Sequence, residues 1–206
     1  MTRILLDTAI PEEIDKFKNI ICGITTNPER VKQAGGIDRL VNYLNTMELH
    51  DTFLVFHQVK SLPDSDKMMA EKKIESKVIT NNWVELIYKI PLLPSLYSLF
   101  QKKTYFTLVE SATMIYDLIQ LNQAALFNVK YAFVIHAKNE DERFLEKAIK
   151  YSEKNNIIPI AASLRTKNDL ERVISLGYKF VTITPSVLEK SYINLQAEEE
   201  YKKFYE

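Results

Sequence analysis

The chain has 206 residues, with 27 basic and 27 acidic side chains and a formal net charge of zero. Hydrophobic residues make up 46% of the chain and charged residues 26%, which is the composition of an ordinary globular domain with one substantial core. No segment concentrates Lys and Arg, and no apolar run reaches the roughly 18 residues of a transmembrane helix, so we expect neither a nucleic-acid partner nor a membrane span.

Short apolar runs alternate with amphipathic stretches along the whole chain. Several runs are nearly continuous in Ile, Val, Leu and Phe, which is typical of parallel strands that are buried on both faces. In chain order they cover 3–7, 20–25, 52–59, 83–90, 104–111, 129–136, 157–163 and 180–184.

Helical patterns separate these apolar runs. The stretch 11–18 opens with a proline and two acids, as a helix N-terminus should, and 95–103 has helical apolar spacing with a basic last turn. The stretch 139–156 begins with Asn and acids and ends basic, and 166–177 ends at a glycine suited to the position after a helix.

Eight strand–helix units, of roughly 26 residues each, predict an α/β fold: a single (β/α)8 TIM barrel that occupies residues 1–206. The alternative is an open doubly wound sheet, but no glycine-rich phosphate loop follows the first predicted strand. The last stretch, about 195–206, is predicted to form an additional terminal helix with Tyr201, Phe204 and Tyr205 on one face.

Polar residues recur where the predicted strands end. In a (β/α)8 barrel these ends carry the active site, whereas in a packed core such groups would lack hydrogen-bond partners. In strand order the residues are Asp7, Thr26 with Asn27, Gln58, Lys89, a polar group at 111–113, His136, and Ser163 with Arg165.

Lys89 is the most informative of these residues, because its neighbours in "ELIYKIPLLP" are apolar. Loss of hydration disfavours the charged amine and should lower its pKa. A neutral amine can attack a carbonyl group and form a Schiff base. A lysine that reaches solvent along its stem, or that is ion-paired, is the alternative interpretation of the same pattern.

Five short motifs carry a resemblance to a known family: "LLDTA" (5–9), "GITTNP" (23–28), "YKIP" (88–91), "AASLRT" (161–166) and "VLEK" (187–190). Together they resemble the transaldolases, especially the small subfamily that includes the fructose-6-phosphate aldolases, over nearly the whole chain. The resemblance implies a (β/α)8 barrel with a Schiff-base lysine and no cofactor. It implies transfer or release of a dihydroxyacetone unit from a ketose phosphate such as fructose 6-phosphate.

The resemblance also implies a role for individual residues. Lys89 matches the imine-forming lysine, and Asp7 matches the acid/base at the donor hydroxyl. Gln58 and Thr113 match the pair that holds the water for proton transfer at the imine. The substrate-binding positions are Thr26 and Asn27 for hydroxyls, and Ser163, Arg165 and Lys138 for the phosphate; Arg165 suits this role best, since its guanidinium can bind a phosphate through two donors.

Some positions depart from the family pattern. Ile135 stands where the aldolases have tyrosine and the transaldolases phenylalanine, and Phe133 stands at a position that is small in the family. Leu92 and Leu93 follow "KIP" in place of small or polar residues. These changes leave open which sugar phosphate is used and whether the outcome is cleavage or transfer. They also leave open a degenerate barrel that binds a sugar phosphate without turnover, and a Schiff-base enzyme for another carbonyl substrate.

Three further expectations concern cellular location, metal binding and assembly. Cys22 is the only cysteine and the first ten residues lack a signal-peptide pattern, so we expect a cytoplasmic protein. No His, Cys and carboxylate cluster has metal-ligand spacing, so we expect no metal site. The resemblance implies a homo-oligomer, a pentamer or decamer, in which the terminal helix packs on a neighbour.

Overall fold

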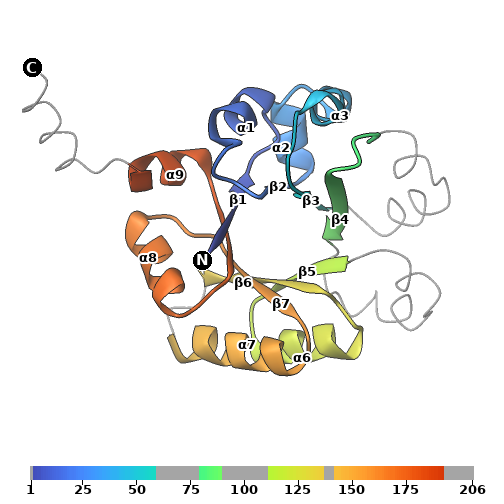
Figure 1. Cartoon of the computed structure of the whole chain (residues 1–206). Coiled ribbons are helices and arrows are strands. Elements are labelled where there is room, and N and C mark those ends of the chain that lie inside the picture. Colours follow the sequence, from blue (N-terminus) through green and yellow to red (C-terminus); the bar gives the residue numbers. More distant parts are fainter. Residues whose placement is uncertain (1, 59–78, 90–110, 137–141, 193–206) are drawn as a thin grey trace, which may run out of the picture.

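A computed structural model of the chain describes residues 2–58, 79–89, 111–136 and 142–192. Eight parallel strands close into a barrel in which each strand pairs with its neighbours in sequence and β1 pairs with β8 (Figure 1). The strands are β1 Arg3–Asp7, β2 Gly23–Thr26, β3 Phe53–Gln58, β4 Val84–Lys89, β5 Ser111–Ile115, β6 Tyr131–Ile135, β7 Ile158–Ala162 and β8 Phe180–Ile183. The predicted (β/α)8 barrel is therefore confirmed.

Helices surround this barrel on the outside (Figure 1). In the described ranges they are α1 Pro11–Phe17, α2 Pro28–Gln33, α3 Ile37–Thr46, α6 Leu118–Leu126, α7 Glu142–Lys154, α8 Lys167–Ser175 and α9 Pro185–Tyr192. The helix predicted at 166–177 is confirmed with its capping signals. Thr166 caps α8 through a reciprocal hydrogen-bond pair with Asp169, and Gly177 has a φ of 92° just after the helix.

The fifth strand lies further along the chain than predicted. It covers Ser111–Ile115, whereas the apolar run predicts a strand at 104–111. Residues 104–110 lie outside the described residues, as do the predicted helix at 95–103 and the predicted terminal helix at about 195–206. The terminal helix and the oligomer that depends on it stay predictions.

Two apolar layers hold the fold together. The inner layer fills the barrel with side chains such as Leu5, Phe56, Ile87, Phe133 and Ile160. Within it, the ring of Phe56 makes an edge-on contact with the ring of Phe133, with 5.2 Å between their centroids. The outer layer packs the other face of the strands against the helices. Because the two layers take alternate residues, each strand presents every second side chain to the barrel interior.

Gly23 marks a place where two strands come unusually close. A Cβ atom at this position would lie 2.1 Å from the carbonyl oxygen of Leu54 on β3. No side chain fits at that distance, so the first residue of the "GITTNP" motif is required by the approach of β2 to β3.

Strand register determines which residues reach the interior at the carboxyl end of the barrel. Asp7 pairs with Thr25, Gln58 with Lys89, and Ile135 with Ala162, so each pair shares one side of the sheet. These inward side chains lie above the apolar layer, at the end of the barrel where (β/α)8 enzymes carry their active sites.

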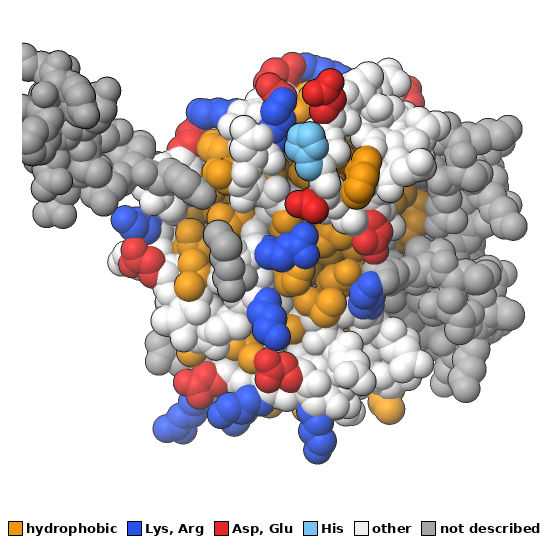
Figure 2. Space-filling view, viewed as in Figure 1, with side chains coloured by type: hydrophobic (Ala, Val, Ile, Leu, Met, Phe, Trp, Pro, Cys, Tyr) orange, Lys and Arg blue, Asp and Glu red, His pale blue; other side chains and the backbone are white. Residues whose placement is uncertain are grey.

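The outer surface mixes charges of both signs. In the face that Figure 2 shows, Lys and Arg side chains are interspersed with Asp and Glu side chains over the described residues. Within the described ranges, no helix has both the length and the apolar character needed to cross a membrane.

Candidate active site

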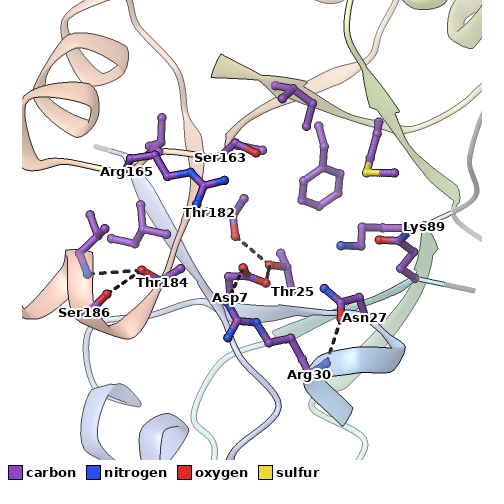
Figure 3. A pocket seen from close by; sticks show the side chains of 18 residues that line it. Asp7, Thr25, Asn27, Arg30, Lys89, Ser163, Arg165, Thr182, Thr184 and Ser186 are labelled. Carbon is purple, nitrogen blue, oxygen red and sulfur yellow. Dashed lines mark hydrogen bonds and ion pairs between the residues drawn. The ribbon is translucent and has the colours of Figure 1, made fainter. Parts of the chain in front are cut away.

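A cavity of about 470 Å³ opens at the carboxyl end of the barrel. Its wall is built from strand ends and from the residues that follow them (Figure 3). The polar and charged lining residues are Asp7, Thr25, Asn27, Arg30, Gln58, Lys89, Ser163, Arg165, Thr182, Thr184 and Ser186. A cavity of this size accommodates a small metabolite.

Lys89 reaches into the cavity from the end of β4 and is only 7% exposed (Figure 3). Burial lowers the pKa of its amine from 10.5 to about 8, although the nearby negative charge of Asp7 acts in the opposite direction. Its Nζ atom lies 5.0 Å from the centroid of the Phe133 ring, which Phe56 supports from the core. Near neutral pH a useful fraction of the amine is therefore unprotonated and nucleophilic.

His57 adds no positive charge beside this amine. Burial, and then the positive charge of Lys89, lower the pKa of His57 to about 4. The imidazole is therefore neutral near neutral pH, and His57 does not line the cavity.

The lowered pKa of Lys89 predicts a distinct pH dependence. The rate of imine formation with dihydroxyacetone should rise about tenfold per pH unit and level off near pH 8, because the neutral amine is the nucleophile. Trapping with cyanoborohydride at a series of pH values measures this rate. A rate that keeps rising to about pH 10.5, where the pKa of an ordinary lysine lies, would show that Lys89 is not desolvated in the way described.

Asp7 is the carboxylate that lines the cavity together with Lys89, and both of its oxygens have polar contacts. Its Oδ1 atom accepts from the Thr25 hydroxyl at 3.3 Å, and its Oδ2 atom lies 3.4 Å from Nη2 of Arg30. The Thr25 hydroxyl is in turn 2.8 Å from the Thr182 hydroxyl on β8 (Figure 3). The carboxylate is thus held at the cavity wall by groups from three different elements.

Asn27 lies between β2 and α2 and caps that helix. Its Oδ1 atom accepts a hydrogen bond from the backbone N–H of Arg30 at 2.9 Å. Because the cap uses the amide oxygen, the amide nitrogen is the atom that remains directed to the cavity (Figure 3). An amide nitrogen can donate to a substrate hydroxyl.

Ser163 and Arg165 follow β7 and form the wall of the cavity that lies across from Lys89 (Figure 3). Ser163 has a φ of 63°, a left-handed backbone conformation that is unusual for a residue other than glycine and that is enriched at functional sites. The backbone N–H groups of Arg165 and Thr166 donate to Oδ2 of Asp169 at 2.8 and 2.9 Å. The backbone that carries the Arg165 guanidinium is therefore fixed, while the guanidinium reaches into the cavity.

His136 lies beneath this turn, at the end of β6. Its Nδ1 atom is 4.0 Å from Oδ1 of Asp169, and the side chain is buried. Burial lowers the pKa of His136, with Asp169 raising it and Arg172 lowering it further. The residue does not line the cavity, so we assign it a place in the support of the turn and no direct contact with a substrate.

The start of α9 completes this side of the cavity. Thr184 follows β8, accepts a hydrogen bond from the backbone N–H of Val187 at 3.4 Å and lies 3.1 Å from the Ser186 hydroxyl. Hydroxyl groups and backbone N–H groups at the start of a helix suit an anion, and loops after strands 7 and 8 bind phosphate in many barrels of this kind.

The structure brings together six of the nine predicted site residues. Lys89, Asp7, Gln58, Asn27, Ser163 and Arg165 all line the cavity. Thr26 does not, and its hydroxyl donates to the backbone oxygen of Asn27 at 3.5 Å. Lys138 lies outside the described residues.

Thr113 is likewise absent from the cavity lining. It is fully buried on β5, where Ala112 is in register with Lys89 and Met114 is in register with Phe133. Since Ala112 and Met114 face the interior, Thr113 faces the helices, and Met114 takes its place at the cavity wall. The structure therefore gives no support to the predicted water-holding role of Thr113.

The polar lining residues that the sequence did not predict are Thr25, Arg30, Thr182, Thr184 and Ser186. The alternation of Phe180 and Thr182 along β8, continued by Thr184 just after the strand, could have revealed these two threonines. Arg30 carries no such signal, because a basic residue at the third position of a six-residue helix is ordinary.

The charges that line the cavity are mostly positive. Arg30, Arg165 and Lys89 supply cationic groups, and Asp7 is the single carboxylate among the lining residues that the structure describes. This excess favours an anionic ligand. Within the described ranges, no three His, Cys, Asp or Glu side chains gather in a way that could bind a metal ion.

Comparison with known proteins adds evidence on the fold. Neither a protein-family model nor a curated protein matches the chain. A mandelate oxidase mutant with a monooxide FMN adduct matches 90% of the chain with a TM-score of 0.59 and 8% identity. Mandelate oxidase with benzoyl-formic acid matches 88% of it with the same TM-score and identity. The chain spans 64% of the length of each of these proteins. At this identity the likeness shows that the chain has the barrel fold, and it says nothing about ligand or reaction.

Proposed function

We propose that the protein is a class I aldolase or transaldolase that acts on a ketose phosphate through an imine on Lys89. The observation that carries this proposal is a lysine that is 7% exposed, lines an active-site cavity and has a pKa lowered to about 8. A structural lysine gains nothing from such a place, because burial penalises its charge.

The first half of the reaction uses Lys89 and Asp7. The neutral Lys89 amine adds to the C2 carbonyl of the ketose, and loss of water gives an iminium ion. Asp7 removes the proton from the C4 hydroxyl as the C3–C4 bond breaks. The electron pair of that bond passes to the iminium, which leaves an enamine on Lys89 and releases an aldehyde.

The second half decides between cleavage and transfer. If the enamine is protonated at C3 and water then hydrolyses the iminium, dihydroxyacetone and free Lys89 result. If C3 of the enamine adds to the aldehyde of an aldose phosphate instead, Asp7 returns its proton to the new C4 oxygen, and water hydrolyses the iminium to release a new ketose phosphate and free Lys89. Met114, Phe133 and Ile135 offer no hydrogen-bond donor at the cavity wall near the amine, and only Gln58 remains of the predicted water-holding pair. We therefore expect slow protonation and a preference for transfer.

The phosphate end of the substrate is assigned to the opposite wall. Arg165 approaches the cavity there with Ser163 beside it and with Thr184 and Ser186 at the start of α9 (Figure 3). A guanidinium with nearby hydroxyl donors suits a phosphate dianion.

Arg165→Ala should weaken phosphorylated substrates selectively. Loss of a hydrogen bond to a charged group costs roughly 1.5–3 kcal/mol, so KM for fructose 6-phosphate should rise by about tenfold or more, while KM for dihydroxyacetone should hardly change. Arg39→Ala, which removes an arginine that pairs with Glu12 outside the cavity, is the matched control. An equal loss for both kinds of substrate would contradict a phosphate-specific role.

The direct test of the proposal is an assay with fructose 6-phosphate, with and without an acceptor aldose phosphate. We expect a new ketose phosphate in the presence of the acceptor and little free dihydroxyacetone in its absence. A degenerate barrel would bind fructose 6-phosphate, with an affinity that depends on Arg165, and would form neither product.

A further inference from the structure

Arg30 is a cavity residue for which the fold offers no structural reason. It is the third residue of α2, a helix of six residues that begins at Pro28, and so it belongs to both the first and the last turn of this helix. The dipole of so short a helix therefore neither favours nor disfavours a cation at this position. The backbone N–H of Arg30 is already satisfied by Asn27, so the cap of α2 does not depend on the side chain.

The described contact of the Arg30 guanidinium is with Asp7. Nη2 lies 3.4 Å from Oδ2, and the two side chains are 35% and 31% exposed. A pair of this exposure contributes little to stability in water, because solvent screens it. The pair therefore has another use, and both partners line the cavity.

Arg30 and Thr25 together fix the orientation of the Asp7 carboxylate. Thr25, on the neighbouring strand β2, donates to Oδ1, and Arg30, on the helix α2 that follows β2, contacts Oδ2. Figure 3 shows Arg30 on one side of Asp7 and Arg165 on the other side of the cavity, with Lys89 entering from a third direction. Two contacts at separate oxygens leave the carboxylate little freedom to rotate.

We propose that Arg30 is a positioning residue that aims Asp7 at the substrate hydroxyl during bond cleavage. This inference rests on the proposed function, in which Asp7 takes the C4 hydroxyl proton. When a substrate fills the cavity it excludes water from the pair, so the attraction between guanidinium and carboxylate strengthens as the reaction begins. Arg30 acts through Asp7 and makes no contact with the reacting atoms.

The positioning role differs from a substrate-binding role in a measurable way. A guanidinium that bound a substrate anion would set affinity, whereas one that aims Asp7 sets the rate of bond cleavage after the imine has formed. The attachment of substrate to Lys89 does not need the Asp7 base, so imine formation and bond cleavage separate the two roles.

The test compares Arg30→Ala with the parent protein and with Arg39→Ala. Two quantities are measured: the fraction of Lys89 trapped by cyanoborohydride with dihydroxyacetone, and kcat and KM for conversion of fructose 6-phosphate. We expect Arg30→Ala to lower kcat by about 10- to 100-fold with trapping and KM nearly unchanged, since small displacements of a catalytic group have effects of this size. Free guanidinium should restore part of kcat, and Arg39→Ala should resemble the parent.

The remaining outcomes decide against one or the other proposal. An unchanged kcat, or a raised KM at constant kcat, would overturn the positioning role and, in the second case, make Arg30 a substrate-binding group. If Arg30→Ala does not fold, Arg30→Lys takes its place, and we expect a smaller fall in kcat with unchanged trapping. If folded Arg30→Lys has the kcat of the parent protein and added guanidinium does not change that kcat, the positioning role is contradicted. Failure to trap Lys89 in the parent protein would overturn the proposed function itself.

Discussion

Replacing Lys89 by methionine should abolish conversion of the ketose phosphate. The methionine side chain is of similar length and cannot form an imine, so the covalent route is lost entirely. We expect kcat/KM to fall by at least about 10⁴-fold, out of the roughly 10⁶-fold or greater acceleration that enzymes achieve. Initial rates with fructose 6-phosphate and an acceptor aldose phosphate measure this loss.

Stability provides the control for this variant. The pKa of Lys89 is lowered in the folded protein, so its charge costs folding free energy below pH 10.5, and that cost is fully present below about pH 8. Methionine carries no charge, and we expect the free energy of unfolding at neutral pH to stay the same or rise. Lys16→Met, at an exposed lysine, should leave the rate unchanged. A folded Lys89→Met protein with substantial activity would contradict the imine mechanism.

Replacing Asp7 by asparagine should slow bond cleavage by about 10²- to 10⁴-fold, the usual range for a general acid or base. Imine formation should respond in the opposite direction. The negative charge of Asp7 raises the pKa of Lys89, so its removal lowers that pKa further and increases the neutral fraction of the amine near neutral pH. Cyanoborohydride trapping with dihydroxyacetone should therefore be as fast as in the parent protein, or faster.

The two measurements on Asp7→Asn are informative as a pair. Asp15→Asn, which removes an exposed carboxylate that pairs with Lys18, is the control and should change neither rate. If trapping and cleavage fall together in Asp7→Asn, then Asp7 acts by holding the cavity in shape, and the base for the C4 hydroxyl is another group.

The barrel and half of the cavity could be predicted because they follow from regular patterns. Apolar runs alternating with capped helices predict a parallel barrel, and the residues that end its strands converge at one rim. Asp7, Gln58 and Lys89 stand at inward positions of strands whose limits the apolar runs predicted to within a residue or two. The sequence alone could therefore predict that these three side chains lie in one cavity.

The β5 wall could not be predicted in the same way. The run at 104–111 looked like a strand, but the strand begins at Ser111. Since side chains alternate along a strand, an error of one residue exchanges the cavity face for the helix face, and Thr113 fell on the helix face with Met114 in the cavity. Counting residues from Lys89 could not resolve this.

Arg30 escaped prediction for a different reason. Its position in the chain is that of an ordinary surface residue of a short helix, and its partner Asp7 lies in a different element of the sequence. Only the closing of β1 beside β2 brings Asp7 within 3.4 Å of its guanidinium. Such pairs depend on tertiary structure and leave no periodic signal.

The most direct test of the mechanism is the mass of the peptide that contains Lys89 after borohydride reduction. In the presence of fructose 6-phosphate or dihydroxyacetone, we expect that peptide, and no other, to gain the mass of a reduced three- or six-carbon adduct. Lys89→Met should gain none, and protein reduced without substrate should be unmodified. An adduct on a different lysine, or no adduct with any ketose, would contradict the imine on Lys89 and with it the proposed aldolase or transaldolase function.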